Sequence, residues 1–436
     1  MEKNVETRPQ PPVGGGLYLA KAPPFWLPMR HFVAAAAAFW LFAAAFVYGR
    51  GRFLGFDIQA QWILGLVHLA TLGWVTMSMF GALCQLAPVL WEAPLRGQRV
   101  AGLAWWLFSF GVAGFVGLLW TGRADYWIPA SMVVAAVLLY LGVFVWTMAA
   151  APKLDWTGKH VANAVGYLAV VVTLGLLLAY DRERGVILSH PAGALIAHIH
   201  LALVGWVSLV IVGVSYRLVS MFALSHIESK TPGRLTLLLA NVGLAGLAVD
   251  AFCTGGEHLR LWAVLLTAAY VSYLSHMRNI LKARTRNVDV ALAFTLLALL
   301  GGAVWCALGL GLAFHGLVDD TNVEQAYVFA ALVGWVTPFI VGQMHKILPF
   351  LVWLHVYSPR GALPAAPLPK MADLTSRRVA WLEFAALVPA IYVTLAGFLR
   401  QSQALLTAGS LFLLAAATLY VANTAITLRH LPRGAS

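Results

Sequence analysis

Twelve mostly apolar stretches, each about as long as a membrane crossing or longer, follow one another along this chain of 436 residues. Hydrophobic residues make up 61% of the sequence and charged residues only 11%, so a water-soluble domain could not bury this much apolar surface. Apolar stretches of about 20 residues are typical of transmembrane helices. The sequence therefore predicts an all-α, polytopic membrane protein with twelve transmembrane helices. They are expected at residues 31–49, 61–90, 101–121, 128–150, 161–180, 192–222, 235–254, 260–278, 289–314, 325–355, 379–399 and 403–427.

These stretches leave no room for a separate soluble domain. We expect one membrane domain over residues 31–428, a cytoplasmic tail over residues 1–30 and a C-terminal cytoplasmic tail over residues 429–436. Residues 1–25 are rich in Pro and Gly and are expected to be disordered. Their mixed charges and missing apolar core argue against a cleaved signal peptide. The Pro-rich connection 355–378 is expected to be a surface loop.

The net charge of +12 is explained by topology. If the N-terminus is inside, 20 of the 29 Lys and Arg residues fall in inner segments and 7 in outer loops. This asymmetry follows the positive-inside rule. It predicts the inner membrane of a bacterium, with both termini in the cytoplasm, and it makes a nucleic-acid partner unnecessary.

One pattern occurs three times, in the second, sixth and tenth predicted helices. Its anchor is Gly-Trp-Val, at residues 73–75, 205–207 and 334–336, with spacings of 132 and 129 residues. Repetition at a long, nearly fixed period indicates one structural unit used three times. We therefore expect three pseudo-symmetric four-helix units, over about residues 31–150, 161–278 and 289–427. The anchor glycines are expected to allow close packing of neighbouring helices or of a flat cofactor.

His68, His198 and His200 are the strongest candidate site residues. They lie in the predicted outer half of the membrane, where polar groups are costly and tend to mark function. Neutral imidazole is a good ligand for iron or copper. A two-residue step on an α-helix rotates by about 200°, so His198 and His200 are expected on opposite sides of their helix. The structural alternative is that all three only bond neighbouring carbonyl groups.

The other histidines are weaker candidates. His345 lies deeper than most of them, but toward the inner end of the tenth helix. The rest are interpreted as interface or solvent histidines in loops or at helix ends: His31, His160, His190, His226, His258, His276, His315, His355 and His430.

Other polar residues and the cysteines have simple structural interpretations. Gln85, Arg217 and Lys346 occupy one repeat position near the inner ends of the three long helices, where snorkelling to the interface is expected. The three cysteines, none at a metal-site spacing, are interpreted as small apolar core residues. They are Cys84, Cys253 and Cys306.

The segment AHIHLALVGWV, with Gly213 downstream, resembles the haem–copper oxidase subunit I superfamily, and most closely the tenth helix of cbb-type oxidases and nitric oxide reductases. That superfamily has twelve helices in three arcs, with ligands on helices 2, 6 and 10. By this likeness, His198 resembles the ligand of a high-spin haem and His200 the ligand of a low-spin haem. His68, with Gly81 and Pro88 downstream, resembles both a helix-2 haem ligand and the copper histidine of the family's sixth helix.

The departures from that family concern copper. The His-x-His motif lies on the sixth helix here, and the tenth has Tyr327 and Phe329 at the matching positions. No consecutive His-His pair occurs in the chain, although the family's copper site requires one. The resemblance therefore implies a divergent, stand-alone member that keeps haem and lacks the usual copper site.

The implied cofactor is haem b, one or two per chain, with His68, His198 and His200 as iron ligands and with copper not expected. The absence of Cys-x-x-Cys-His excludes covalent c-type attachment. The implied function is electron transfer in respiratory or nitrogen-oxide metabolism, as an oxidoreductase if the chain is an enzyme. Two alternatives stay open: a haem or copper carrier, sensor or assembly factor, and gas chemistry on NO or O2 at a high-spin haem.

The expected partners are the lipid bilayer, a quinol or cytochrome electron donor and small membrane subunits. Two arrangements of the histidines also stay open. His68 and His198 could share one cleft while His200 faces another near Tyr327 or Phe329, or His68 could pair with His200 as a bis-histidine set.

Overall fold

The chain is almost entirely helical. The computed structural model describes residues 23–54, 60–225, 231–315, 321–358 and 368–432. These residues contain no strand, which confirms the all-α prediction, and a helix lies at each of the twelve predicted stretches. Eleven helices in this part of the chain are long and apolar enough to cross a membrane. The other predicted span, α11 (Leu259–Lys282), is 24 residues long and more polar, since it carries Arg260, Arg278 and Lys282.

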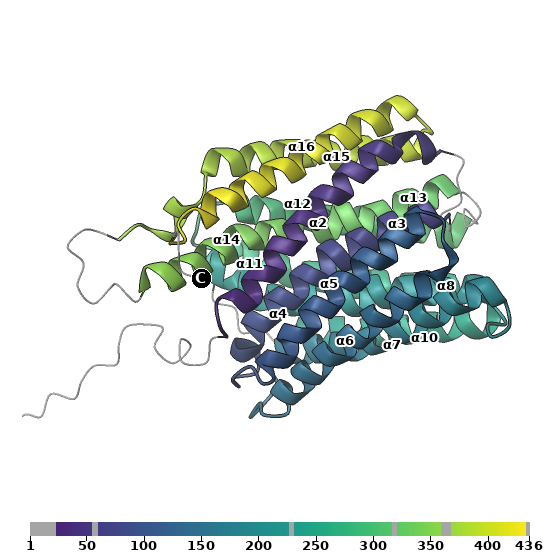
Figure 1. Ribbon diagram of the computed structural model, residues 1–436, viewed down its shortest axis with the longest axis horizontal. Coiled ribbons are helices and arrows are strands. Elements are labelled where there is room, and N and C mark those ends of the chain that lie inside the picture. Colours follow the sequence, from purple (N-terminus) through teal and green to yellow (C-terminus); the bar gives the residue numbers. More distant parts are fainter. Residues whose placement is uncertain (1–22, 55–59, 226–230, 316–320, 359–367, 433–436) are drawn as a thin grey trace, which may run out of the picture.

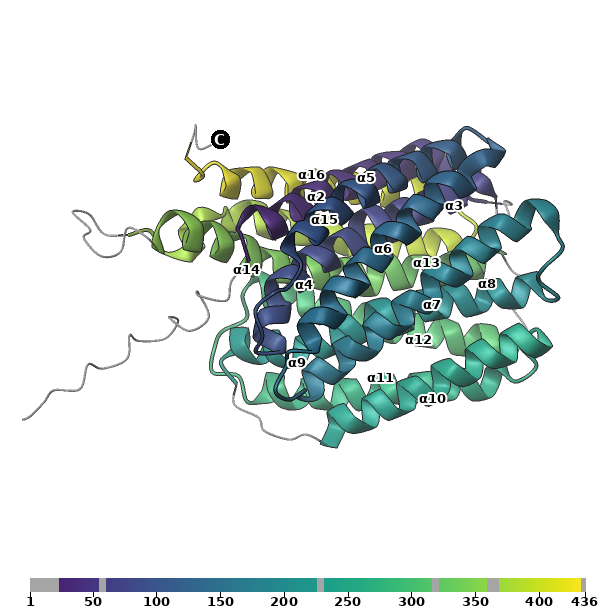
Figure 2. The ribbon, with the colours of Figure 1, turned by 60° about the horizontal axis from the view of Figure 1, so that its bottom comes forward.

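The helices lie side by side in one bundle (Figure 1, Figure 2). We describe them in chain order as three units of four spans, each with its Gly-Trp-Val anchor in the second span. The first contains α2 (Trp26–Gly49), a second span made of α3 (Gln61–His68), η2 (Leu69–Thr76) and α4 (Met77–Leu90), then α5 (Gln98–Trp120) and α6 (Trp127–Met148). The second contains α7 (Trp156–Arg184), a sixth span made of α8 (Pro191–His200), η4 (Leu201–Ser208) and α9 (Leu209–Ala223), then α10 (Thr231–Thr254) and α11. The third contains α12 (Val290–His315), a tenth span made of α13 (Thr321–Phe329), η6 (Ala330–Val336) and α14 (Thr337–Val356), then α15 (Arg377–Leu399) and α16 (Gln403–Leu428). Short 3-10 turns lie at η1 (Arg50–Arg52), η3 (Ala124–Tyr126) and η8 (Met371–Leu374).

The second span of each unit lies inside the bundle. The second, sixth and tenth spans bury a larger share of their residues than the other spans do. The other helices surround them: α6 packs on α7, α11 packs on α12, and α16 packs back on α2. The beginning of α2 and the end of α16 lie at the same end of the bundle (Figure 1).

Each Gly-Trp-Val anchor lies in a π-helical segment, a rare conformation that is often found at functional sites. In these segments the indole ring of each Trp contacts a side-chain hydroxyl group of another unit. The hydroxyl group belongs to the residue two positions after the Trp of that other unit. The indole Nε1–H groups donate three hydrogen bonds: Trp74 to Thr337 at 3.1 Å, Trp206 to Thr76 at 3.2 Å and Trp335 to Ser208 at 3.0 Å. The bonds form a closed, buried ring at which the three units meet.

The anchor glycines allow close helix packing, as predicted. A Cβ atom at Gly205 would lie 2.8 Å from side-chain atoms of Leu244 and Tyr167. In the third unit, a Cβ atom at Gly301 would overlap the carbonyl oxygen of Gly334. Small residues at such crossings let helix backbones approach in a membrane.

The first helix begins at Trp26 rather than at residue 31. Pro28 is tolerated because the first turn of a helix needs no backbone N–H, and Leu27 and Met29 are buried. The predicted tail over residues 1–30 is therefore partly helical. Residues 1–22 and 433–436 of the predicted tails, and residues 359–367 of the Pro-rich loop, lie outside the described residues.

Candidate functional site

The sixth span carries two histidines that point to different neighbours. His198 and His200 lie in the last turn of α8, directly before η4. Nε2 of His200 lies 2.9 Å from the hydroxyl oxygen of Tyr327 in the tenth span. His198 packs against α7, where a Cβ atom at Gly175 would lie 2.8 Å from its Cε1. The predicted opposite orientations of the two histidines are confirmed.

His68 lies in the same part of the bundle as His198. The hydrophobic cluster that contains Phe115, the ring beside His68, packs against Leu176 of α7, and His198 packs against Gly175 of the same helix. Nδ1 of His68 lies 2.7 Å from the carbonyl oxygen of Leu64, and its ring stands edge-on to Phe115 at a centroid distance of 5.0 Å. Nδ1 of His198 is buried and has no hydrogen-bond partner in the part of the chain that the structure describes. The hydrogen bond between His200 and Tyr327 favours the first of the two arrangements, in which His200 faces a different cleft from that of His68.

Both pairs follow one rule of the repeat. The residue five positions before the Gly of one unit is paired with the residue seven positions before the Gly of the next unit. This rule pairs His68 with His198, and His200 with Tyr327. Tyr327 therefore occupies in the third unit the position that His198 occupies in the second.

The third cleft, between the tenth and second spans, has no ligand at these positions. The same rule assigns it Phe329 and Leu66, and both side chains are buried. The ring of Phe329 packs against Phe46 and Phe398 at centroid distances of 5.6 Å and 5.9 Å. Phe46 also packs against Phe53 at 4.5 Å. Phe329 therefore packs within a cluster of aromatic rings.

A cavity of about 440 Å³ lies beside His200 and Tyr327. The sixth and tenth spans form its wall together with α10, α11 and α12. The wall is mostly apolar, and its larger side chains include Tyr270, Trp305 and Trp335. Cofactor and small-molecule sites are typically apolar cavities of about 300–1,000 Å³ with a few polar groups.

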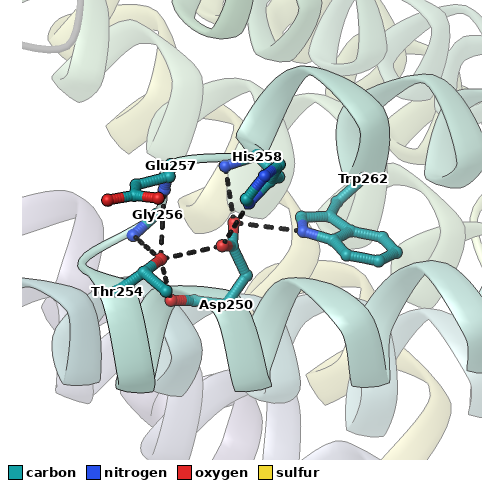
Figure 3. Close-up of polar contacts among 6 residues, drawn as sticks. All are labelled: Asp250, Thr254, Gly256, Glu257, His258 and Trp262. Atoms are coloured by element: carbon teal, nitrogen blue, oxygen red, sulfur yellow. Dashed lines mark hydrogen bonds and ion pairs between the residues drawn. The ribbon is translucent and has the colours of Figure 1, made fainter.

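Asp250 stabilises the connection between α10 and α11, two helices that form one side of this cavity (Figure 3). Its carboxylate accepts hydrogen bonds from Thr254 Oγ1 at 2.8 Å, from the His258 backbone N–H at 2.9 Å and from Trp262 Nε1 at 3.1 Å, and His258 Nδ1 lies 3.0 Å away. Leu259, beside this cluster in sequence, lines the cavity. The cluster therefore helps to hold the cavity wall in position.

The residues around the cavity could hold a haem. A ligating histidine usually donates its other N–H group to a carbonyl oxygen or carboxylate. Nδ1 of His200 lies 2.8 Å from the carbonyl oxygen of Ile196, so the neutral ring carries its hydrogen there and presents the Nε2 lone pair toward Tyr327 and the cavity. The bond from His68 to Leu64 favours the same tautomer. An apolar wall suits a macrocycle and limits the access of water.

The expectation that the three cysteines are small core residues is confirmed for Cys84 only. Cys84 is buried, Cys253 is exposed on α10, and Cys306 lines the cavity. No group of three or more His, Cys, Asp or Glu side chains that could hold a metal ion occurs among the described residues. The expected absence of copper stays a prediction for metal analysis.

Three histidines interpreted as interface or solvent residues are buried, so that interpretation was wrong for them. Nε2 of His31 lies 2.6 Å from the hydroxyl oxygen of Tyr140, and His160 and His276 both stand edge-on to the ring of Tyr216. All three lie one or two turns inside their helices, where neighbouring helices cover them. Of the others, His190, His258 and His355 are exposed and His430 is half-buried, whereas His226 and the side chain of His315 lie outside the described residues.

Two polar pairs toward the C-terminal end of the tenth span were not predicted. His345 Nε2 lies 3.1 Å from Glu383 Oε2, and both side chains are buried. Lys346 binds Asp289, the residue before α12, so its amine is paired rather than simply snorkelling. Burial of Asp289 favours its neutral form, but hydrogen bonds from Lys346 and from the Leu292 backbone N–H outweigh this effect and lower its pKa. In the sequence, Glu383 stands alone in an apolar stretch, and this feature could have indicated the first pair.

No protein-family model matches this chain, and no curated protein matches it. The likeness to haem–copper oxidases therefore rests on the motif residues and their spacing.

Proposed function

We propose that this chain is a membrane haem protein that binds b-type haem beside His200 and transfers electrons. The observation that carries the proposal is the apolar cavity of about 440 Å³ in which a neutral imidazole, held by the Ile196 carbonyl group, offers its Nε2. Intramembrane ionisable residues are costly and are retained mainly for function.

In this proposal each residue has a defined task. His200 would bind the haem iron through Nε2, Ile196 would hold its tautomer, and the apolar wall would exclude water. The haem, when bound, supplies one-electron chemistry. His68 and His198 offer a second position for iron, in keeping with the likeness of His198 to a high-spin haem ligand, so the holoprotein would carry one haem or two.

We further propose a place in the inner membrane of a bacterium, with both termini in the cytoplasm. The support is the excess of Lys and Arg in alternate connections of the helices. The motif residues favour an oxidase-like role in respiratory or nitrogen-oxide metabolism, with a quinol or a cytochrome as electron donor and without oxygen reduction at a copper site.

The test is the optical spectrum of protein purified from haem-replete cells, oxidised and after dithionite reduction, with pyridine haemochrome and metal analysis. We expect b-type bands and no stoichiometric copper. His200→Ala should lose or alter a haem, whereas His355→Ala, a change at an exposed histidine, should not. Protein without haem would overturn the proposal.

The same preparation separates the alternatives. An electron carrier should hold haem tightly and be reduced quickly by a quinol or cytochrome. Exchangeable haem would favour a carrier or sensor instead. Binding of NO or CO to the reduced protein, lost in His198→Ala but not in His355→Ala, would favour gas chemistry at His198.

A further inference from the structure

Tyr327 has the repeat position of a candidate ligand, although only histidines are expected to bind haem iron in this chain. It occupies the repeat position of His198, and its hydroxyl oxygen lies 2.9 Å from Nε2 of His200. Another buried pair of this kind, Tyr140 with His31, lies away from the cavity, whereas Tyr327 and His200 both line it.

The surroundings keep the phenol in this position. The ring of Trp305 lies against Tyr327 at a centroid distance of 5.7 Å, and a Cβ atom at Gly309 of α12 would lie 3.0 Å from its Cε2. Tyr327 and His200 both line the cavity, and their hydrogen bond of 2.9 Å joins the tenth span to the sixth there.

We propose that Tyr327 is the second protein ligand of the iron of a haem held on His200, which rests on the function proposed above. Binding would exchange the hydrogen bond between the two side chains for one bond from each of them to iron. The phenol would lose its proton as its oxygen binds iron, and the carboxylate of Glu324 would accept that proton. Glu324 lines the same cavity and lies one helical turn from Tyr327. No electron is gained or lost in this step.

The electrostatics of an apolar site favour this ligand. Ferric iron in a porphyrin carries net positive charge, and an uncompensated charge is costly in surroundings of low dielectric constant. A phenolate neutralises that charge, whereas a second imidazole would not. Tyrosine is an established type of haem ligand, and the axial ligands largely set the reduction potential. Tyr327 would therefore stabilise the ferric form and lower the potential.

The experiment compares ferric optical and electron paramagnetic resonance spectra, and the midpoint potential, of the wild-type holoprotein and its variants. Tyr327→Phe should keep haem on His200, lose the phenolate-to-iron absorption, become five-coordinate and high-spin, and shift the potential upward. Tyr327→His should give the low-spin spectrum of two imidazoles. Tyr392→Phe, a half-buried tyrosine of α15 away from the cavity, should change neither property.

The outcomes separate this inference from the proposed function. Haem that is lost in His200→Ala but spectrally unchanged in Tyr327→Phe would overturn the assignment of Tyr327 and leave the haem on His200. Wild-type protein without haem would overturn both. If Tyr327→Phe does not accumulate, Tyr327→His decides alone: without a bis-imidazole spectrum, Tyr327 is not a ligand.

Discussion

The cleft between the sixth and tenth spans contrasts with the cleft between the tenth and second spans. The repeat supplies the same two positions to each. In the first cleft these positions are His200 and Tyr327, beside a cavity of about 440 Å³. In the second they are Phe329, which packs against two phenylalanine rings, and Leu66, which is buried. The backbone repeat defines where a cofactor could lie, and the side chains at two positions per unit decide whether it can.

The cleft of His68 and His198 is intermediate. It has two potential ligands, but His198 is packed tightly against Gly175. The three clefts thus form a series from open to filled on one framework. Substitutions confined to one cleft therefore test whether the side chains of that cleft determine stability, cofactor binding or both.

The largest effect is expected in the filled cleft. Phe329→Ala removes a buried ring that contacts Phe46 and Phe398. We expect a loss of about 3 kcal/mol in the free energy of unfolding, the lower end for a buried Phe→Ala change, because packing rather than transfer from water drives helix association in lipid. Haem content per folded protein should not change. Thermal unfolding in detergent, with haem quantified on the same sample, measures both, and a selective loss of haem would contradict the division of roles between the clefts.

The next effect concerns the intermediate cleft. Gly175→Ala places a Cβ atom 2.8 Å from Cε1 of His198, whereas nothing lies within 4 Å of a Cβ atom at Gly166 on the same helix. Both substitutions gain helix propensity, so their difference isolates the clash, which we expect to cost about 1–3 kcal/mol. Spectral features due to His198 should change in Gly175→Ala and not in Gly166→Ala. Equal melting temperatures and spectra for the two variants would show that His198 is not confined by α7.

Much of this architecture could be predicted because it depends on short-range properties of the sequence. The length and hydropathy of each stretch are local, and the second span was expected at residues 61–90, where the structure has it. The opposite orientations of His198 and His200 follow from the rotation of about 100° per residue in an α-helix. Both lie in α8, before the π-helical segment that would have changed this rotation.

The remaining features depend on contacts between distant segments. No local pattern assigns Trp206 to Thr76, which lies 130 residues away, or His345 to Glu383. The burial of His31 could not be read from its place near the end of an apolar stretch, because it depends on Tyr140 of another helix. The cavity likewise depends on how α10 and α11 stand against the sixth and tenth spans.

A smaller effect is expected at the ring of Trp side chains, to which each of the three units contributes one Trp and one hydroxyl group. Thr76→Val removes the acceptor of the Trp206 N–H group and keeps the side-chain shape. We expect a loss of roughly 1 kcal/mol, since a hydrogen bond between membrane helices contributes modestly but a buried N–H group is left unpaired. Thr337→Val should behave in the same way through Trp74. Denaturant titrations that gave clearly unequal losses would show that the units do not contribute equally to the ring.

The smallest change in stability is expected in the open cleft, and it gives the sharpest comparison. Gly309→Ala brings a Cβ atom to 3.0 Å from Cε2 of Tyr327, whereas a Cβ atom at Gly311, two residues on, meets nothing within 4 Å. The gain in helix propensity, about 1 kcal/mol, should nearly offset the small displacement of the phenol, because the adjoining cavity leaves it room to move. Gly311→Ala should be stabilised by that full amount. If Tyr327 binds iron, the ferric spectrum should shift in Gly309→Ala and not in Gly311→Ala, while the two melting curves differ by only a few degrees. A large loss of stability in Gly309→Ala would mean that this cleft is packed as tightly as the one around Phe329, and the contrast between open and filled clefts would fail.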